Sequence, residues 1–511
     1  MSHIAIHKEN GGTDRKITNL NSYDIDVAAQ LAAGIDVPLD PAKANRVKRK
    51  IDLHILPLMC LIYLIQFADK ITLGQSAVLG ILKDAHLEQN QFDWLSTVFY
   101  LSFLAFQLPQ SYALQRFPVG KWVSVNILVW SIALLCHAAA KSFRTLLVCR
   151  FFLGIAEGAI TPGFMIVTSM FYTRAEQMRR VGYWFLMNGT AIILLGLVAY
   201  GTLHISHGAL DPWQWLMIIT GLITFVAAIL FWFFFPDSPA TARFLTQPEK
   251  TVAIERIKAN QAGVENKHFK REQVVEVFKD PKTYLFFFFA AISNVTNSLS
   301  NQRQIIVAEF GFSAIDTTLL GCVDGLFEII WIFVGTMGAS YWPHGRAYMC
   351  ALHYLVAIFG AILVTTLPWS DKVGLLFSYW IAISYIAPFV IFLSWVGNVT
   401  AGHTKRVTTN AIVMVGYAIG NTVGPQYWQL RYDPRNRVPW AILAACWAAS
   451  MLILLAARFY LARENWRRER ELRDTAYDEA YVVDEKGEEK RVDRAFLDLT
   501  DIQNREFRYT L

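Results

Sequence analysis

Residues 214–235 have the sequence QWLMIITGLITFVAAILFWFFF, which contains no charged side chain. An α-helix rises ~1.5 Å per residue and the apolar core of a bilayer is ~30 Å thick, so about 20 such residues cross a membrane as one helix. Eleven other apolar stretches have comparable lengths, at about 53–74, 92–114, 122–140, 145–172, 181–203, 284–308, 318–340, 347–367, 374–396, 407–428 and 439–461. A polar break separates the stretches into two sets of six. We therefore predict an all-α membrane protein with 12 transmembrane helices in two six-helix bundles, an architecture typical of transporters.

The composition fits this class and argues against others. Of the 511 residues, 54% are hydrophobic and only 17% are charged, whereas soluble domains contain about 25% charged residues. The net charge of +6 is modest, and no Lys/Arg stripe with interleaved aromatic residues is present, which argues against nucleic-acid binding. The six cysteines all lie in apolar stretches without a C-x-x-C pair, which excludes a disulfide framework and a zinc site of common spacing. We expect no metal and no cofactor.

Basic residues indicate the orientation in the membrane. They precede the first span (Arg46, Lys48), follow the last one (Arg463, Arg467) and are frequent in the central polar break. Because cytosolic loops carry an excess of Lys and Arg, we expect both termini in the cytosol. The chain begins without a signal-peptide pattern, so the first span should direct insertion of this multi-pass protein, which we expect in the plasma membrane. The predicted regions are an N-terminal tail (1–50), an N-terminal bundle (51–236), a central cytosolic loop (237–282), a C-terminal bundle (283–461) and a C-terminal tail (462–511).

Ionisable side chains inside the first set of spans are candidate functional groups, because their burial in a bilayer is costly. Arg150 and Glu157 are seven residues apart in the fourth span, nearly two helical turns, so they share a face. They would form either a pair that holds a proton or orders a gate, or a structural ion pair. Asp69 and Lys70 end the first span and face different directions. Either one faces a cavity while the other contacts a neighbouring helix, or both lie at an interfacial helix end.

The second set of spans contains three further charges of interest. Asp324 and Glu328 lie one turn apart, and two like charges in a low dielectric do not both ionise easily. Either one of them holds a proton, as proton coupling requires, or both approach a solvated helix end. Arg303 has a guanidinium fork that matches a carboxylate, so it either helps to bind an anionic substrate or lies at an unwound, lumenal end of the seventh span. The candidates for the substrate and proton pathway are Asp69, Lys70, Gln75, Arg150, Glu157, Asn188, Asn297, Arg303, Asp324, Glu328, Asn398 and Asn421.

Several sequence strings resemble a known family. Asn188-Gly189 in the fifth span and Gly420-Asn421 in the eleventh give the two halves a faint correspondence, as in the parallel repeats of major facilitators. The string RFFLGIAEGAITPG at 150–163 resembles the fourth helix of the fungal anion:cation symporters, a branch of that superfamily. Other strings agree with its allantoate permease-like members: QFADK (66–70), WLS (94–96), PVGK (118–121), EQMRR (176–180), PDSP (236–239), NVTAGHTKR (398–406) and GNTVGPQ (420–426).

The resemblance extends from about residue 46 to the end of the chain. It implies the major facilitator fold, with a cavity between the halves whose access alternates between the two sides. It also implies secondary active uptake of a small organic anion, driven by the proton gradient. Allantoate, ureido acids, small peptides and carboxylate vitamins are substrate classes of the family. Two departures leave the substrate open: residues 297–303 read NSLSNQR where an Asn-Gly and aromatic stretch is expected, and Asp324 is unusual.

Three other functions compete with uptake. An efflux antiporter for a secondary metabolite would share the fold, but residues 188–196 lack the proline that drug antiporters carry in the fifth span. A nutrient receptor that binds without transporting is a second alternative. An enzyme is disfavoured because the chain has no HExxH, G-x-S-x-G or P-loop motif, so we predict that it is not an enzyme. The expected partners are a small organic anion, protons and the lipid bilayer, without nucleic acid, and we expect a monomer.

Overall fold

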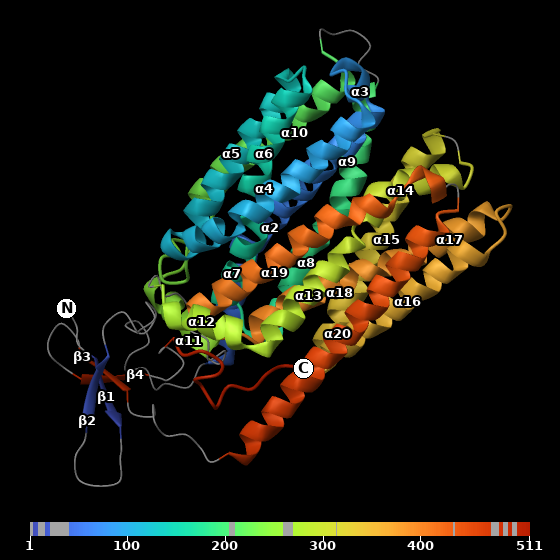
Figure 1. Cartoon of the computed structure of the whole chain (residues 1–511). Helices are drawn as coiled ribbons and strands as arrows, with labels where there is room; N and C mark the ends of the chain where they lie inside the picture. Colours follow the sequence, from blue (N-terminus) through green and yellow to red (C-terminus); the bar gives the residue numbers. More distant parts are fainter. Residues whose placement is uncertain are drawn as a thin grey trace.

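The computed structural model describes residues 4–8, 16–20, 40–203, 210–258, 269–312, 314–432, 435–471, 480–483, 489–492 and 498–511. Within these ranges, each of the predicted apolar stretches is helical. Figure 1 shows two groups of helices side by side, the blue-to-green N-terminal half and the yellow-to-red C-terminal half. The C-terminus lies at the same end of the molecule as α11 (Gln247–Lys258) and α12 (Arg271–Lys279). We call this end the termini end and the opposite one the far end.

The N-terminal half begins with a helix that is longer than the predicted span. The carboxylate of Asp40 accepts a hydrogen bond from the Ala42 N–H (2.9 Å), and Pro41 occupies the first turn, so the helix starts inside the expected tail. Its first turns are held by the ion pair Lys50–Glu249 (2.7 Å), which joins them to α11. The helices of this half are α2 (Pro41–Val78), α3 (Ile81–Asp84), α4 (Gln89–Arg116), α5 (Val119–Ala139), α6 (Phe143–Glu157), α7 (Ile160–Phe171), α8 (Arg174–Phe185), α9 (Met187–Leu203) and α10 (Pro212–Phe234).

The C-terminal half repeats this plan. Its helices are α13 (Pro281–Val295), α14 (Ser298–Glu309), α15 (Ala314–Tyr341), α16 (Arg346–Thr366), α17 (Lys372–Ala382), α18 (Ile386–Asn398), α19 (His403–Val423) and α20 (Arg437–Arg470). Short 3₁₀ segments η2 (Ile383–Tyr385), η3 (Gly424–Tyr427) and η4 (Leu430–Tyr432) connect some of them. The halves meet where α15 contacts α8 and α9, and where α19 contacts α4.

Four predicted spans are helix pairs rather than single helices, and two of the breaks have a clear cause. A proline inside a helix cannot donate to the carbonyl four residues earlier and pushes that carbonyl away. Pro162 lies four residues after Gly158, where α6 gives way to α7, and Pro388 lies four residues after Ser384, within η2 between α17 and α18. The other breaks, at Leu186 and at 296–297, fall beside the candidate residues Asn188 and Asn297.

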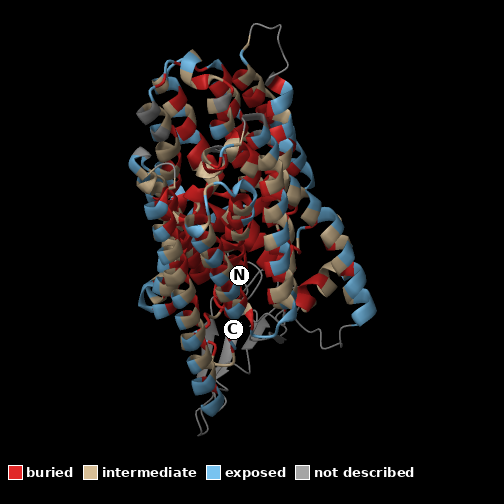
Figure 2. Ribbon diagram, turned by 90° about the vertical axis from the view of Figure 1, so that its right-hand side faces the viewer, coloured by how far each residue is buried: buried red, intermediate tan, exposed pale blue. Residues whose placement is uncertain are grey.

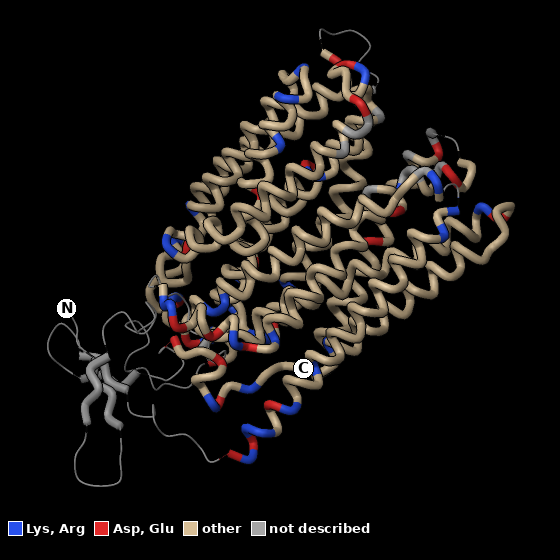
Figure 3. The backbone as a smooth tube through the Cα atoms, in the orientation of Figure 1, with Lys and Arg blue, Asp and Glu red and all other residues tan. Residues whose placement is uncertain are grey.

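The surface is typical of a membrane protein. By length and composition, nine helices or helix pairs of the described residues could cross a membrane. Three predicted spans do not meet these criteria: α4, α13 with α14, and α19. All three contribute polar side chains to the cavity described below. Figure 2 shows a buried interior under an exposed outer surface, and Figure 3 shows the charged residues gathered mainly towards the two ends. On α10, Phe233 and Phe234 are 66% and 67% exposed, as expected of side chains that face lipid.

These observations agree with the predicted helical two-bundle architecture. The number of membrane crossings and the cytosolic location of the termini stay predictions, and so do the boundaries of the five regions. One feature was not predicted: β1 (Ile4–Lys8), β2 (Lys16–Leu20), β3 (Ala480–Val483) and β4 (Glu489–Val492) pair in the order β2-β1-β3-β4. The all-α prediction therefore holds for the bundles and not for the tails. Because β1 pairs with β3 from the opposite end of the chain, no local sequence pattern signals this sheet.

Candidate substrate site

A cavity of about 1130 Å³ lies between the two halves. Its walls come from α2, α4, α6 and α9 on one side and from α13, α14, α15, α18 and α19 on the other. It reaches the far end, where Leu82 and Phe92 of one half face Gln429 and Asn436 of the other. In Figure 1 the two halves diverge towards this end and converge towards the termini end.

Direct contacts between the halves close the termini end. Gln115 of α4 donates to the hydroxyl of Thr404 on α19 (2.8 Å), and Arg406 of α19 donates to Ser169 of α7 (3.0 Å). Arg179 of α8 donates to Ser340 of α15 (2.8 Å). The protein is therefore in a state that is open at the far end and closed at the termini end.

Lys70 lies in the cavity wall and contacts the opposite half. Its ammonium donates a short hydrogen bond to the hydroxyl of Tyr417 and lies 5.4 Å from the ring centroid of Tyr100. Among the described residues, Lys70 forms no ion pair with a carboxylate. Its positive charge lies between two aromatic rings in the cavity and interacts electrostatically with Glu157, but no carboxylate among the described residues pairs with it directly. The ammonium can therefore still contact an anionic ligand.

Asp69, which precedes Lys70, faces the other way. It is fully buried, does not line the cavity, and accepts a hydrogen bond from Thr224 of α10 (2.9 Å). One residue of the sequence pair therefore lines the cavity while the other contacts a neighbouring helix.

Arg150 and Glu157 both line the cavity on α6, with exposures of only 2% and 1%. No ion pair joins these two described residues, because two turns separate them by about 10 Å along the axis. Two guanidinium nitrogens of Arg150 and Oε1 of Glu157 are buried and have no hydrogen-bond partner among the described residues. Buried polar atoms normally have partners, so these positions are suited to water, a proton or a ligand. The structure therefore contradicts the alternative of a structural ion pair, whereas a pair that holds a proton or orders a gate stays a prediction.

Arg303, Asp324 and Glu328 form the corresponding charged group of the C-terminal half. Arg303 and Glu328 line the cavity, while Asp324 lies behind the wall and accepts a hydrogen bond from the indole of Trp380 (2.7 Å). Both carboxylates are 2% exposed and interact electrostatically with Arg303. They are buried in the wall and not at a solvated helix end. Glu328 also contacts Asn188 of α9, so the group touches both halves.

Two asparagines, Asn294 and Asn421, fix the orientation of the Asn297 amide in the cavity. Asn294 and Asn421 donate their NH₂ groups to the carbonyls of Ala290 (2.7 Å) and Tyr417 (2.9 Å), which can only accept. Their amide oxygens are therefore free to accept from the NH₂ group of Asn297, at 3.0 Å and 3.3 Å. This leaves the Oδ1 of Asn297 as an acceptor at the break between α13 and α14, without a donor among the described residues.

Most of the predicted site residues meet in this cavity. Three do not line it: Asp69, Asp324 and Asn398. Asn398 ends α18 at the closed termini end, where it is 1% exposed and its amide has no partner among the described residues. The residues in the cavity are Lys70, Gln75, Arg150, Glu157, Asn188, Asn297, Arg303, Glu328 and Asn421.

Sequence reasoning missed the aromatic partners of Lys70. Tyr100 and Tyr417 lie in apolar stretches that contain many aromatic residues, most of which pack in the core or face outwards. One signal was present: Tyr417 precedes the candidate Asn421 by four residues, so the two share a helix face.

Comparison with known proteins places this site in a family. The model of the Major Facilitator Superfamily matches residues 59–425. The thiamine pathway transporter of Saccharomyces cerevisiae is 34% identical over 91% of this chain and 86% of its own length. The allantoate permease of the same organism is 32% identical over 96% of this chain and 91% of its own length.

A solved structure shares the fold at low sequence identity. The proton:xylose symporter bound to 6-bromo-6-deoxy-D-glucose matches with a TM-score of 0.62 and 12% identity, covering 82% of this chain and 96% of that one. These matches confirm the predicted family and fold and agree with the prediction that the protein is not an enzyme. The chain is an integral, multi-pass membrane transporter that belongs to the Major Facilitator Superfamily, within its fungal allantoate permease-like branch.

Proposed function

We propose that this transporter imports a small organic anion together with protons across the plasma membrane, as a monomer that alternates access to the central cavity. The observation that carries the proposal is the charge balance around Arg303. The single guanidinium of Arg303 interacts electrostatically with two buried carboxylates, those of Asp324 and Glu328. All three groups lie at a wall that an anion must approach.

The positive groups of the cavity suit an anionic substrate. Lys70 reaches in from the N-terminal half and Arg303 from the C-terminal half, so an anion between them would be bound by both. Hydrogen bonds between a cation and a carboxylate are shorter and stronger than neutral ones, and they are stronger still in a site of low dielectric. The similarity to a relative named allantoate permease supports a substrate of this kind.

The carboxylates supply a means of coupling. If Asp324 and Glu328 are both ionised, they already exceed the charge of Arg303, and a third negative charge from the substrate is repelled. A proton on Glu328, which lines the cavity, removes that excess. Anion and proton then favour each other's binding, and this effect is reciprocal because the two binding equilibria are linked.

The amide oxygen of Asn297 adds selectivity. It is an acceptor held in place by Asn294 and Asn421, so an N–H or O–H group on the substrate would satisfy it. A carbonyl or a second carboxylate at this position would face it with another acceptor. Among small organic anions, those with a donor near the carboxylate are favoured.

If the termini end is cytosolic, an inward proton gradient drives the anion and the proton into the cell together. The described state is then open to the outside, and the contacts of Gln115, Ser169 and Arg179 with the C-terminal half must break to release substrate inside. Rocking of one half against the other is the motion expected of this fold.

Uptake in intact cells tests the proposal. Accumulation of a panel of labelled carboxylates would be measured at several external pH values, with and without a protonophore, for the wild type and for Arg303→Gln. Arg243→Gln, at an exposed residue outside the cavity, is the matched control. We expect accumulation that rises at acidic external pH and is abolished by the protonophore. Accumulation should be at least tenfold weaker in Arg303→Gln and unchanged in Arg243→Gln, because a loss of this size is typical when a charge-assisted hydrogen bond is removed. Accumulation of none of the anions, or accumulation unaffected by the proton gradient, would overturn it, and proton-dependent export would instead favour the efflux alternative.

A further inference from the structure

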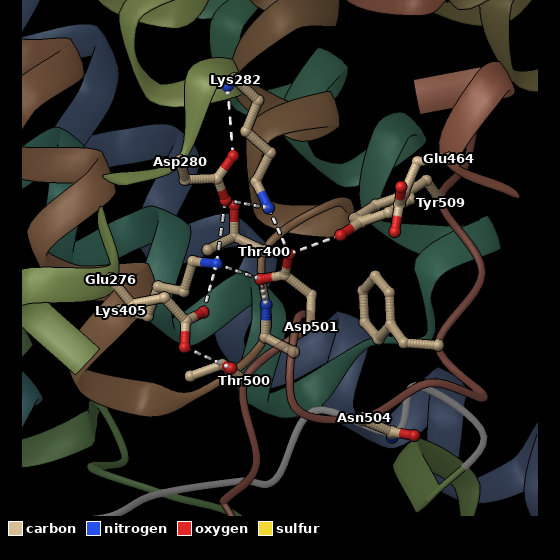
Figure 4. A network of polar contacts seen from close by, with 12 residues as sticks. Glu276, Asp280, Lys282, Thr400, Lys405, Glu464, Thr500, Asp501, Asn504 and Tyr509 are labelled. Atoms are coloured by element: carbon tan, nitrogen blue, oxygen red, sulfur yellow. Dashed lines mark hydrogen bonds and ion pairs between the residues drawn. The ribbon is translucent and has the colours of Figure 1, made fainter. Parts of the chain in front are cut away.

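The end of the chain folds back onto the termini end of the C-terminal bundle. Residues 498–511 are separated from the end of α20 at Arg470, yet several of their side chains are buried. Thr500, Asp501 and Phe507 are fully buried, and Tyr509 is 4% exposed. Figure 4 shows this segment beside the first turns of α13 and α19. We call residues 498–511 the C-terminal strap.

Asp501 is the centre of the docked strap. One carboxylate oxygen forms an ion pair with Lys405 (3.0 Å) and accepts from the N–H of Ala401 (3.2 Å). The other accepts a short hydrogen bond from Lys282 and one from the hydroxyl of Tyr509 (2.7 Å). The carboxylate therefore joins the start of α13, the loop before α19 and the strap itself.

Arg468 of α20 recognises the folded shape of the strap. Its guanidinium donates to the backbone carbonyls of Asp501 and Phe507, both at 2.9 Å, and to the hydroxyl of Tyr509 (2.9 Å). Asn465, one turn earlier on α20, bonds both the N–H and the carbonyl of Tyr509 (2.9 and 2.8 Å). Contacts of this number and specificity are those of a bound peptide and not of a solvated tail.

The strap also connects to the contacts that close the termini end. Lys405, which holds Asp501, lies between Thr404 and Arg406, the two residues of α19 that bond the N-terminal half. In addition, Arg174 of α8 donates to the carbonyl of Arg508 (3.2 Å), and its guanidinium lies 4.1 Å from the ring centroid of Phe507. The strap thus contacts both halves and cannot keep all these contacts when the halves part at this end.

We propose that the basic cluster of Lys282, Lys405 and Arg468 is a binding site for an acidic, aromatic peptide, and that its occupant is the C-terminal strap. Binding of the strap favours the state closed at the termini end. A ligand that binds one of two states more tightly shifts the population towards that state. Release of the strap is then a step in opening towards the termini end, and a partner that captured the strap would change the transport rate. The inference is independent of which substrate is carried.

Hydrogen exchange of the full-length protein tests this inference. We compare the wild type with Asp501→Asn, and use Ile502→Ala as the matched control because Ile502 is 39% exposed beside Asp501. Asp501→Asn should raise exchange about tenfold or more at residues 402–410 and at 112–117, on the two sides of the closed end, because a buried carboxylate between two lysines is lost. Ile502→Ala should leave exchange at these residues unchanged.

A peptide added in trans separates docking from a general loss of structure. The wild-type peptide DLTDIQNREFRYTL should restore protection in the Asp501→Asn protein, whereas the same peptide carrying Asp501→Asn should not. The proposal is overturned if Asp501→Asn exchanges like Ile502→Ala at the closed end. It is equally overturned if exchange rises throughout both bundles and the wild-type peptide restores nothing, since the strap would then be a structural part of the C-terminal bundle.

Discussion

Gly189 of α9 and Gly325 of α15 face each other where the two halves cross. A Cβ added to Gly325 would lie 2.6 Å from the carbonyl oxygen of Gly189, and one added to Gly189 would come even closer to the carbonyl of Gly325. Neither position has room for a methyl group, so the backbones themselves are in contact. The crossing also brings Asn188 next to Glu328 and so links the carboxylate that we propose to couple proton and anion to the opposite half.

We therefore expect Gly189→Ala to impair transport. Forcing a methyl group into a packed contact costs about 1–3 kcal/mol and would push α9 away from α15. Uptake should fall about tenfold or more, measured as the initial rate at equal amounts of protein in the membrane. The control is Gly201→Ala on the same helix, where a Cβ would meet nothing within 4 Å. Equal rates for the two variants would show that this close approach is unimportant for the transport cycle.

A second prediction concerns Lys70 and its partner across the cavity. Lys70→Met should raise the KM for the transported anion by about 10–100-fold, since hydrogen bonds to charged groups contribute about 1.5–3 kcal/mol. Tyr417→Phe keeps the ring and removes only the hydroxyl that Lys70 contacts, so its KM should rise by a few-fold at most. Measured KM values that are the same for Lys70→Met and wild type would remove Lys70 from the binding site.

The contrast between Lys70 and Tyr417 illustrates which site residues can be predicted from the sequence. Charged residues such as Lys70 and Arg303 are conspicuous in apolar spans because their burial in a bilayer is costly. The fold is also predictable, because the length of each apolar stretch matches the thickness of the bilayer. Tyr417 carries no such signal, since an aromatic side chain is equally at home in the core, in lipid or in a cavity. For the pair Asp69 and Lys70 the sequence predicts that one faces the cavity and the other a neighbouring helix, but only the structure shows that Asp69 is the one that faces Thr224.

The features that the sequence does not predict depend on contacts between residues far apart in the chain. Asp501 and Lys282 are separated by 219 residues, and the local sequence around Asp501 does not show which residues its carboxylate contacts. The docked strap could be found only from the three-dimensional arrangement. The fixed orientation of Asn297 is similar, because it depends on two other amides, one of them 124 residues away.

That orientation leads to a prediction about selectivity. Asn297→Leu should weaken inhibition by N-acetylglycine more than inhibition by acetoxyacetate, in which oxygen replaces the N–H. Loss of one hydrogen bond of about 1 kcal/mol corresponds to about a fivefold change in relative inhibition constants. The paired inhibitors are the internal control, because a general packing defect would weaken both alike. Inhibition constants against uptake of the transported anion provide the measurement.

Glu328→Gln should separate binding from coupling. The amide resembles the protonated acid in shape and charge, so anion binding should persist and lose its dependence on external pH. Exchange of labelled for unlabelled anion should continue, whereas accumulation against a gradient should be lost. Glu272→Gln, at an exposed residue of α12, should behave as wild type. Proton-driven accumulation by Glu328→Gln would show that another group carries the proton.

The pH dependence of the strap should differ from that of transport. Burial alone would raise the pKa of the Asp501 carboxyl, but the charges of Lys282 and Lys405 outweigh this effect and hold the pKa below its ordinary value. Tyr509 donates to the same carboxylate, and Arg468 faces the backbone carbonyl of Asp501. The nearby acids Asp280 and Glu276 pair with the lysines.

A carboxyl whose pKa is lowered on docking stabilises the docked state fully above its free pKa of about 3.9, and this contribution is lost only as the pH falls below that value. Protection of residues 498–511 from hydrogen exchange, corrected for the intrinsic effect of pH, should thus be constant between about pH 6 and pH 8. Uptake should change over the same range if Glu328 exchanges its proton there. Release of the strap in step with uptake would contradict the assignment of Asp501 as its ionised anchor and would place the control of docking on another titrating group.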